Sequence, residues 1–92
     1  MLERQVEAYL GSKIKRLGGK CWKWTGMSGV PDRIVFLPGG VVAFVEVKTV
    51  GGRVSAIQAV VHGMIRALGT PVFVVYTKAE IDVLLDHLQG RW

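Results

Sequence analysis

The chain has 92 residues, which is enough for one domain spanning residues 1–92 and leaves no room for a second core. No apolar run approaches the roughly 18 residues of a membrane span, and the single cysteine, Cys21, excludes both an intrachain disulfide and a cysteine-based zinc cluster. The net charge of +5 favours a polyanionic partner such as nucleic acid, and the cysteine content fits a reducing, cytoplasmic setting.

Residues 2–17 have the periodicity of an amphipathic helix, and Gly18-Gly19 is typical of a helix end. Glu3 and Glu7 lie one turn apart at the edge of the apolar stripe, where a carboxylate is poorly placed for full solvation. Both also suit the start of a helix, where the helix dipole favours acidic residues, and Glu3 could pair with a neighbouring Lys or Arg. The pattern alone leaves the two interpretations open.

Residues 20–25 alternate aromatic with small or basic residues, which indicates a strand. Trp22 and Trp24 share one face of that strand, and we expect at least one of them to belong to the core. The alternative is an exposed surface beside Lys20 and Lys23 that stacks on bases or contacts a second copy.

Residues 30–49 carry the strongest local pattern. Two runs rich in Val, Ile and Phe flank the turn Pro38-Gly39-Gly40, which predicts a β-hairpin. If Leu37 pairs with Val41, the same register sets Asp32 opposite Glu46. Like charges directly opposite in a sheet are destabilising, and a divalent cation between them removes the penalty. Lys48 follows on the face of Glu46, so the hairpin predicts a metal site with a lysine beside it.

The second half of the chain predicts a helix, a strand and a further helix. Residues 55–68 open with Ser55 and Gln58 in the pattern of a capping box. That helix is apolar around most of its circumference, and only Gln58, His62 and Arg66 form a polar stripe. His62 has no second His or Cys nearby, so we interpret it as part of the stripe rather than as a metal ligand. A helix apolar on two sides predicts a partner chain as well as its own sheet.

Residues 72–76 form a continuous apolar run typical of a buried, parallel strand. Thr77 and Glu80 then give a second capping box, which opens a last amphipathic helix ended by Gly90. The predicted order is helix, three strands, helix, strand, helix. We therefore expect an α/β fold around a mixed sheet.

Asp32, Glu46 and Lys48 suggest a definite chemistry. Carboxylate oxygens select Mg²⁺ or Mn²⁺ over zinc. Such an ion binds a phosphate oxygen and activates a bound water, and an adjacent lysine can orient that water and offset charge that develops in the transition state. The predicted activity is metal-dependent hydrolysis of phosphodiester bonds.

These motifs resemble the PD-(D/E)xK nuclease superfamily and, more narrowly, its stand-alone VRR-NUC proteins from phages and bacteria. The resemblance rests on residues 29–34 (G-V-P-D-R-I), residues 45–49 (V-E-V-K-T), residues 51–58 (G-G-R-V-S-A-I-Q), a glutamate in the first helix and the final strand. It implies a restriction-endonuclease-like αβββαβ core, a mixed sheet flanked by helices, and a C-terminal helix.

The resemblance also implies a role for each site residue. Asp32 and Glu46 are expected to bind Mg²⁺, or Mn²⁺ as a substitute, together with the backbone carbonyl of Val47. Lys48 is expected to assist the attacking water. Two further residues complete the set by resemblance: Glu7, selected over Glu3 by its eleven-residue spacing from Gly18, and Gln58, which the sequence alone predicts only as a helix cap.

Small VRR-NUC proteins resemble Holliday junction resolvases, which implies a homodimer that cuts branched or four-way DNA in a bacterial host or phage setting. Val60, Val61, Met64 or the Trp22/Trp24 face could form the interface. Two alternatives remain open. The chain could be a non-catalytic, nuclease-like module that binds DNA or recruits a partner, or Asp32, Glu46 and Lys48 could form a structural charge network in an unrelated fold.

Overall fold

The computed structural model describes residues 2–90. Within them the elements follow the predicted order: α1 (Glu3–Arg16), β1 (Lys20–Lys23), β2 (Arg33–Leu37), β3 (Val41–Val47), α2 (Ala56–Ala67), β4 (Val72–Val75) and α3 (Lys78–Leu88). The predicted capping boxes are present at the starts of α2 and α3, with Ser55 and Thr77 as the capping residues. The predicted α/β class with a C-terminal helix is confirmed.

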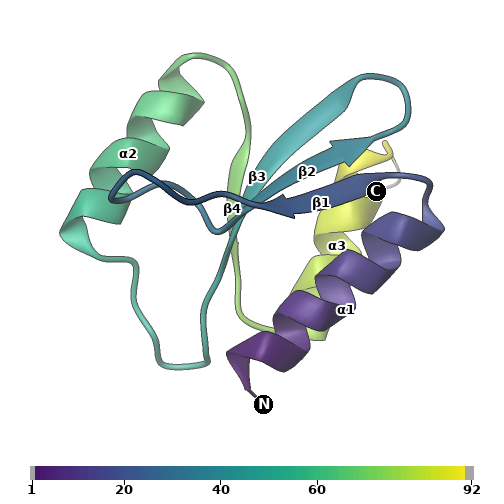
Figure 1. The fold of residues 1–92 in the computed structure, drawn as a ribbon, viewed down its shortest axis with the longest axis horizontal. Helices are drawn as coiled ribbons and strands as arrows, with labels where there is room; N and C mark the ends of the chain where they lie inside the picture. Colours follow the sequence, from purple (N-terminus) through teal and green to yellow (C-terminus); the bar gives the residue numbers. More distant parts are fainter. Residues whose placement is uncertain (1, 91–92) are drawn as a thin grey trace.

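The four strands form one mixed sheet in the order β1-β2-β3-β4 (Figure 1). The pairs β1–β2 and β2–β3 are antiparallel, whereas β4 joins β3 in parallel after the crossover through α2. Leu37 pairs with Val41 and Arg33 with Val45, so the predicted register of the hairpin is confirmed. The Trp24 N–H donates to the carbonyl of Asp32 at 2.9 Å, which ties the segment before β2 to the chain following β1.

One face of the sheet carries the hydrophobic core and is covered by α1 and α3, which lie on the same side of the sheet (Figure 1). Strand alternation turns Val35 of β2 and Val45 and Val47 of β3 toward these helices, and all three are fully buried. The helices contribute the apolar residues Val6, Leu10 and Ile14 from α1 and Ile81, Leu84 and Leu85 from α3. Burying an aliphatic side chain of this size contributes about 1.5–3 kcal/mol, so this layer holds β3 in a fixed position.

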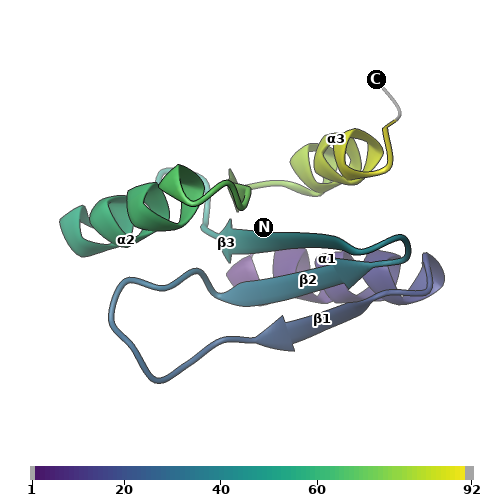
Figure 2. The same ribbon diagram turned by 90° about the horizontal axis from the view of Figure 1, so that it is seen from above.

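Helix α2 lies across the sheet from α1 and α3, as the view from above also indicates (Figure 2). Its polar stripe, to which His62 belongs as predicted, faces inward, and the His62 side chain is only 1% exposed. The physical reason is Glu46, which points to this side of the sheet and needs polar neighbours. The apolar side of α2 faces outward instead, with four exposed residues: Ile57, Val60, Met64 and Leu68. Val61 is buried within the monomer, which removes it from the candidate interface.

The sheet face next to α2 also carries accessible aromatic side chains. Trp22 packs edge-on against Phe36 with ring centroids 5.3 Å apart, and Trp24 lies against Phe44 at 5.1 Å. Trp22 is 57% exposed and Trp24 is half-buried, so neither belongs to the buried core and the expected core role is wrong.

No helix within residues 2–90 is long and apolar enough to cross a membrane.

Gly29 is the close-contact point between α2 and the loop that leads to Asp32. Its φ is +86°, and a Cβ at this position would lie 2.8 Å from both the carbonyl oxygen of Ile57 and Cγ2 of Val61. Gly39 in the hairpin turn has a similar φ of +88° but no atom within 4 Å of such a Cβ. A side chain at either position would strain the backbone, but only a side chain at Gly29 would also overlap with α2.

We predict that Gly29→Ala destabilises the protein more than Gly39→Ala. Both variants force alanine into the left-handed region at a cost of about 1–2 kcal/mol, and Gly29→Ala adds an overpacking term of about 1–3 kcal/mol. Urea unfolding monitored by tryptophan fluorescence measures the two free energies of unfolding. Equal losses in the two variants would show that the contact with α2 is not tight.

Candidate metal centre

Asp32 and Glu46 meet at the end of the hairpin, as the register predicted. Asp32 lies one residue before β2, and its Oδ2 accepts a hydrogen bond of 3.1 Å from the backbone N–H of Val47. The N–H and C=O of one strand residue point to the same side of the strand, so the Val47 carbonyl also points toward Asp32. The extended end of β3 thus places two oxygen donors, a carboxylate and a carbonyl, beside each other.

Glu46 is the most buried acidic residue described, with an exposed fraction of 1%. Its Oε2 accepts a hydrogen bond of 3.1 Å from Nε2 of Gln58, and Lys48 Nζ lies 3.4 Å from the same oxygen. The Gln58 amide is itself oriented, because its Oε1 accepts the N–H of Ser55 at 2.9 Å as part of the helix cap. Gln58 therefore caps α2 and binds Glu46 at the same time.

The pKa of Glu46 is raised to about 7. Burial is the main cause, the neighbouring charge of Asp32 adds to it, and the Lys48 ammonium opposes both. A divalent cation would replace the lost solvation of the carboxylate and screen it from Asp32. Oε1 of Glu46 is also buried and has no hydrogen-bond partner among residues 2–90. The oxygen donors, the unpaired oxygen and the raised pKa all fit a hard divalent metal.

The first helix brings two more carboxylates to Asp32. The carboxylates of Glu3, Glu7 and Asp32 place one oxygen each within 4.8 Å of one another, and all three side chains are half-buried. Glu7 accepts a hydrogen bond of 3.0 Å from Nη2 of Arg33. The expected pairing of Glu3 with a Lys or Arg is not seen among the ion pairs of the described residues. Both helix glutamates therefore reach the site, and distance does not choose Glu7 over Glu3.

Two further residues lie beside the carboxylates: Arg33, which the sequence did not single out, and His62, which it placed only in the polar stripe of α2. Arg33 follows Asp32 directly, and strand alternation turns it to the opposite face, where it pairs with Glu7. His62 lies one turn after Gln58, with its Nε2 3.8 Å from Oε1 of Glu46. Burial lowers the pKa of His62, and the positive charges of Arg66 and Lys48 lower it further. The spacing of four residues from Gln58 was the available indication, but it does not say which side of the helix faces the sheet.

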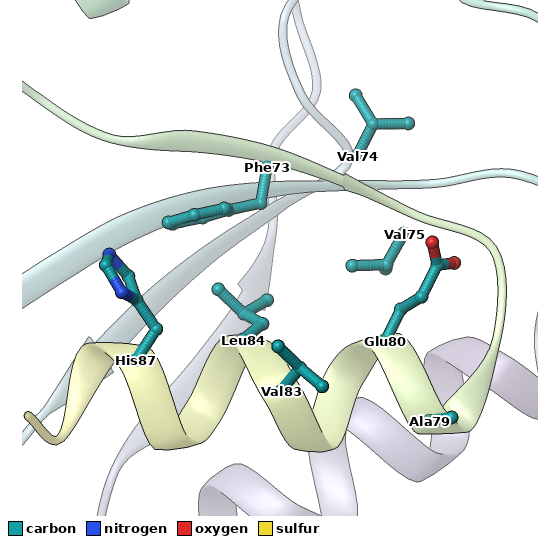
Figure 3. Close-up of a pocket in the computed structure, with 8 residues that line it drawn as sticks. All are labelled: Phe73, Val74, Val75, Ala79, Glu80, Val83, Leu84 and His87. Carbon is teal, nitrogen blue, oxygen red and sulfur yellow. The ribbon is translucent and has the colours of Figure 1, made fainter. Parts of the chain in front are cut away.

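A surface cavity of about 490 Å³ lies between β4 and α3 (Figure 3). Phe73, Val83 and Leu84 make it mainly apolar, and its titratable residues are Glu80 and His87. Glu80 is already used by the cap of α3, where its Oε1 accepts the N–H of Tyr76 at 2.7 Å. None of the residues of the carboxylate site lines this cavity, so it offers no chemistry for phosphodiester hydrolysis.

The raised pKa of Glu46 predicts a pH-dependent stability of the metal-free protein. A carboxyl whose folded pKa exceeds its unfolded value stabilises the fold below the unfolded pKa, near 4.5, and this contribution is lost as pH rises through about 7. Glutamine does not titrate, so Glu46→Gln does not lose this contribution to stability as pH rises. We expect the difference in unfolding free energy between Glu46→Gln and the parent to rise by about 1–3 kcal/mol from pH 5 to pH 8 in EDTA. Urea titrations at both pH values measure it, and a difference that does not change with pH contradicts the assigned environment.

Comparison with known proteins agrees with these motifs. No protein-family model matches the chain. A phage protein named "Putative nuclease p44", from Acyrthosiphon pisum secondary endosymbiont phage 1, is 39% identical over 84 residues, covering 89% of this chain and 90% of the relative. A solved structure described as a VRR_NUC domain superposes with a TM-score of 0.84 at 36% identity, over 92% of this chain and 95% of the other. The chain belongs to the VRR-NUC nuclease family.

Proposed function

We propose that this protein is a Mg²⁺-dependent endonuclease that hydrolyses phosphodiester bonds in DNA. The observation that carries the proposal is the convergence of Asp32, Glu46 and Lys48 at the end of one hairpin, with Glu46 buried and its pKa raised to about 7. A structural charge network has no use for two neighbouring carboxylates, one of them buried with an unpaired oxygen.

Asp32, Glu46 and the Val47 carbonyl would hold the metal, and Mn²⁺ would fit the same oxygen donors. The helix carboxylates Glu7 and Glu3 lie close enough to Asp32 to bind the metal directly or through water. When bound, the ion would polarise a phosphate oxygen and lower the pKa of an attacking water. Arg33 fixes Glu7 through their ion pair, and Gln58 fixes Glu46.

Lys48 is suited to the step at the phosphate. Its Nζ lies 3.4 Å from Glu46 while its side chain stays 20% exposed, so it can contact both the metal ligand and an incoming backbone. An ammonium in this position orients the attacking water and offsets the negative charge that builds on the phosphate in the transition state. The net charge of +5 would collect the DNA backbone and make binding dependent on salt.

We further propose that the protein acts as a homodimer on branched DNA, including four-way junctions. The support is the outward apolar side of α2, with Val60 and Met64 exposed, together with the accessible Trp22 on the neighbouring sheet face. A two-fold dimer carries two active sites, which suits symmetric cleavage of a four-way junction. The phage relative fits a protein encoded by a phage or bacterium and working in the bacterial cytoplasm.

Cleavage assays test the catalytic assignment. With Mg²⁺ or Mn²⁺ the parent should cut branched DNA, and Asp32→Ala, Glu46→Ala and Lys48→Ala should each lower the rate by about 100-fold or more, because each removes a ligand or a charge used in the transition state. EDTA should abolish cutting. The matched controls are Lys78→Ala and Asp86→Ala, exposed residues of α3 that should cut like the parent.

Two results would contradict the assignment. Undiminished cutting by Glu46→Ala and Lys48→Ala would show that these residues are not the site. Junction binding that is equal in metal and in EDTA, without cleavage, would support the non-catalytic binding module instead. A panel of four-way, flap and linear substrates then ranks the preferred DNA shape.

Light scattering tests the dimer. The parent should have about twice the monomer mass of 10.1 kDa at micromolar concentration. Val60→Glu should shift the protein to the monomer, because a charge cannot be buried unpaired in an apolar interface. The control, Ala59→Glu, places the same charge on an exposed residue of α2 that is turned to a different side of the helix from Val60 and Met64. A monomeric parent, or a dimer that survives Val60→Glu, would refute this interface.

A further inference from the structure

We propose that His62 is a positioning residue of the metal centre, whose imidazole N–H holds the second oxygen of Glu46 while Gln58 holds the first. The inference rests on the proposed function, because it takes Glu46 to be a metal ligand. It assigns a role to a residue that neither the hairpin motif nor the helix cap explains.

The main observation is a pair of buried atoms that face each other without partners. Nε2 of His62 and Oε1 of Glu46 are 3.8 Å apart, and neither makes a hydrogen bond within residues 2–90. Both residues are only 1% exposed, so bulk water does not satisfy these atoms. Unpaired buried polar atoms are costly, and an approach of less than 1 Å would pair both at once. A neutral imidazole protonated on Nε2 donates, and the carboxylate accepts.

The second observation is the division of the two carboxylate oxygens. Two groups contact Oε2 of Glu46: Nε2 of Gln58 donates a hydrogen bond to it at 3.1 Å, and Nζ of Lys48 lies 3.4 Å from it. Oε1 faces His62. Since Gln58 and His62 are one turn apart on α2, a single helix face can hold the carboxylate at both oxygens. A carboxylate fixed at two points cannot rotate about its terminal bond, which defines the direction in which its remaining lone pairs meet a metal.

An ordinary core role does not account for the position of His62. An imidazole used only to fill space would be replaced equally well by an apolar side chain, and its ring nitrogen would gain nothing from a carboxylate neighbour. If His62 bound the metal directly through Nε2, this nitrogen would have to be unprotonated, whereas the positioning role requires it to carry a proton. The protonation of Nε2 therefore separates the positioning role from a ligand role.

Metal titration provides the first test. Calorimetry should give a Mn²⁺ dissociation constant about tenfold or more weaker for His62→Leu than for the parent. His62→Gln places a side-chain N–H at a similar reach and should recover affinity to within about threefold of the parent. His87→Leu, which changes a histidine in the cavity between β4 and α3, should bind Mn²⁺ as the parent does. Folded His62→Leu that binds Mn²⁺ within about threefold of the parent would overturn the proposal.

Imidazole NMR of the parent protein gives an answer even if His62→Leu fails to fold. Long-range proton–nitrogen spectra, with and without Mg²⁺, should show Nε2 of His62 protonated in both states. An unprotonated Nε2 in the Mg²⁺-loaded protein would overturn the proposal. A parent that binds no Mn²⁺ at all would contradict the proposed function itself, whereas a parent that binds while His62→Leu binds equally well would reject only the role of His62.

Discussion

The burial of Glu46 is the constraint on which the rest of the structure depends. A carboxylate that is 1% exposed and lies beside Asp32 cannot stay charged without compensation, and its raised pKa of about 7 expresses that conflict. Among residues 2–90, Lys48 supplies an ammonium and Gln58 an amide, whereas Oε1 has no hydrogen-bond partner. A cation bound beside Glu46 would relieve this conflict, as the proposed function requires. The buried carboxylate that destabilises the metal-free fold is thus the same group that is proposed to bind the metal.

This constraint also determines how α2 sits on the sheet. A helix normally buries its apolar side, but here the polar residues Gln58 and His62 face inward because Glu46 needs them. The apolar residues Val60 and Met64 are consequently turned outward. Their exposure is therefore linked to the site, since rotating α2 to hide them would remove the partners of Glu46. A second copy that covers this side would stabilise the orientation of α2 and, through it, the proposed metal ligand.

The sequence predicted the hairpin, its register and the meeting of Asp32 with Glu46 because these are local consequences of a short turn and a two-residue period. It did not predict which way α2 faces, because a helix with one polar stripe and apolar flanks fits the sheet in two orientations that differ only in long-range contacts. The same limit applies to Trp22, which is exposed on β1 while α2 packs against β4 at the other edge of the sheet. The helical pattern alone could not rank Glu3 and Glu7, since one helical turn separates them and both reach Asp32; the resemblance selected Glu7.

Asp32 and Arg33 show how two adjacent residues can join neighbouring elements. Asp32 lies at the end of the hairpin, near both Glu46 and the carboxylates of α1, while Arg33 turns to the side of α1 and binds Glu7 at 3.0 Å. Because α1 is anchored in the core by Val6 and Leu10, its acidic side chains are carried to the edge of the sheet by rigid packing rather than by a flexible loop. The hairpin thus meets α1 at Asp32 and meets α2 at Glu46, and all three elements hold their polar groups in fixed positions. Preorganisation of this kind would favour the proposed metal site, since little conformational freedom would be lost on binding an ion.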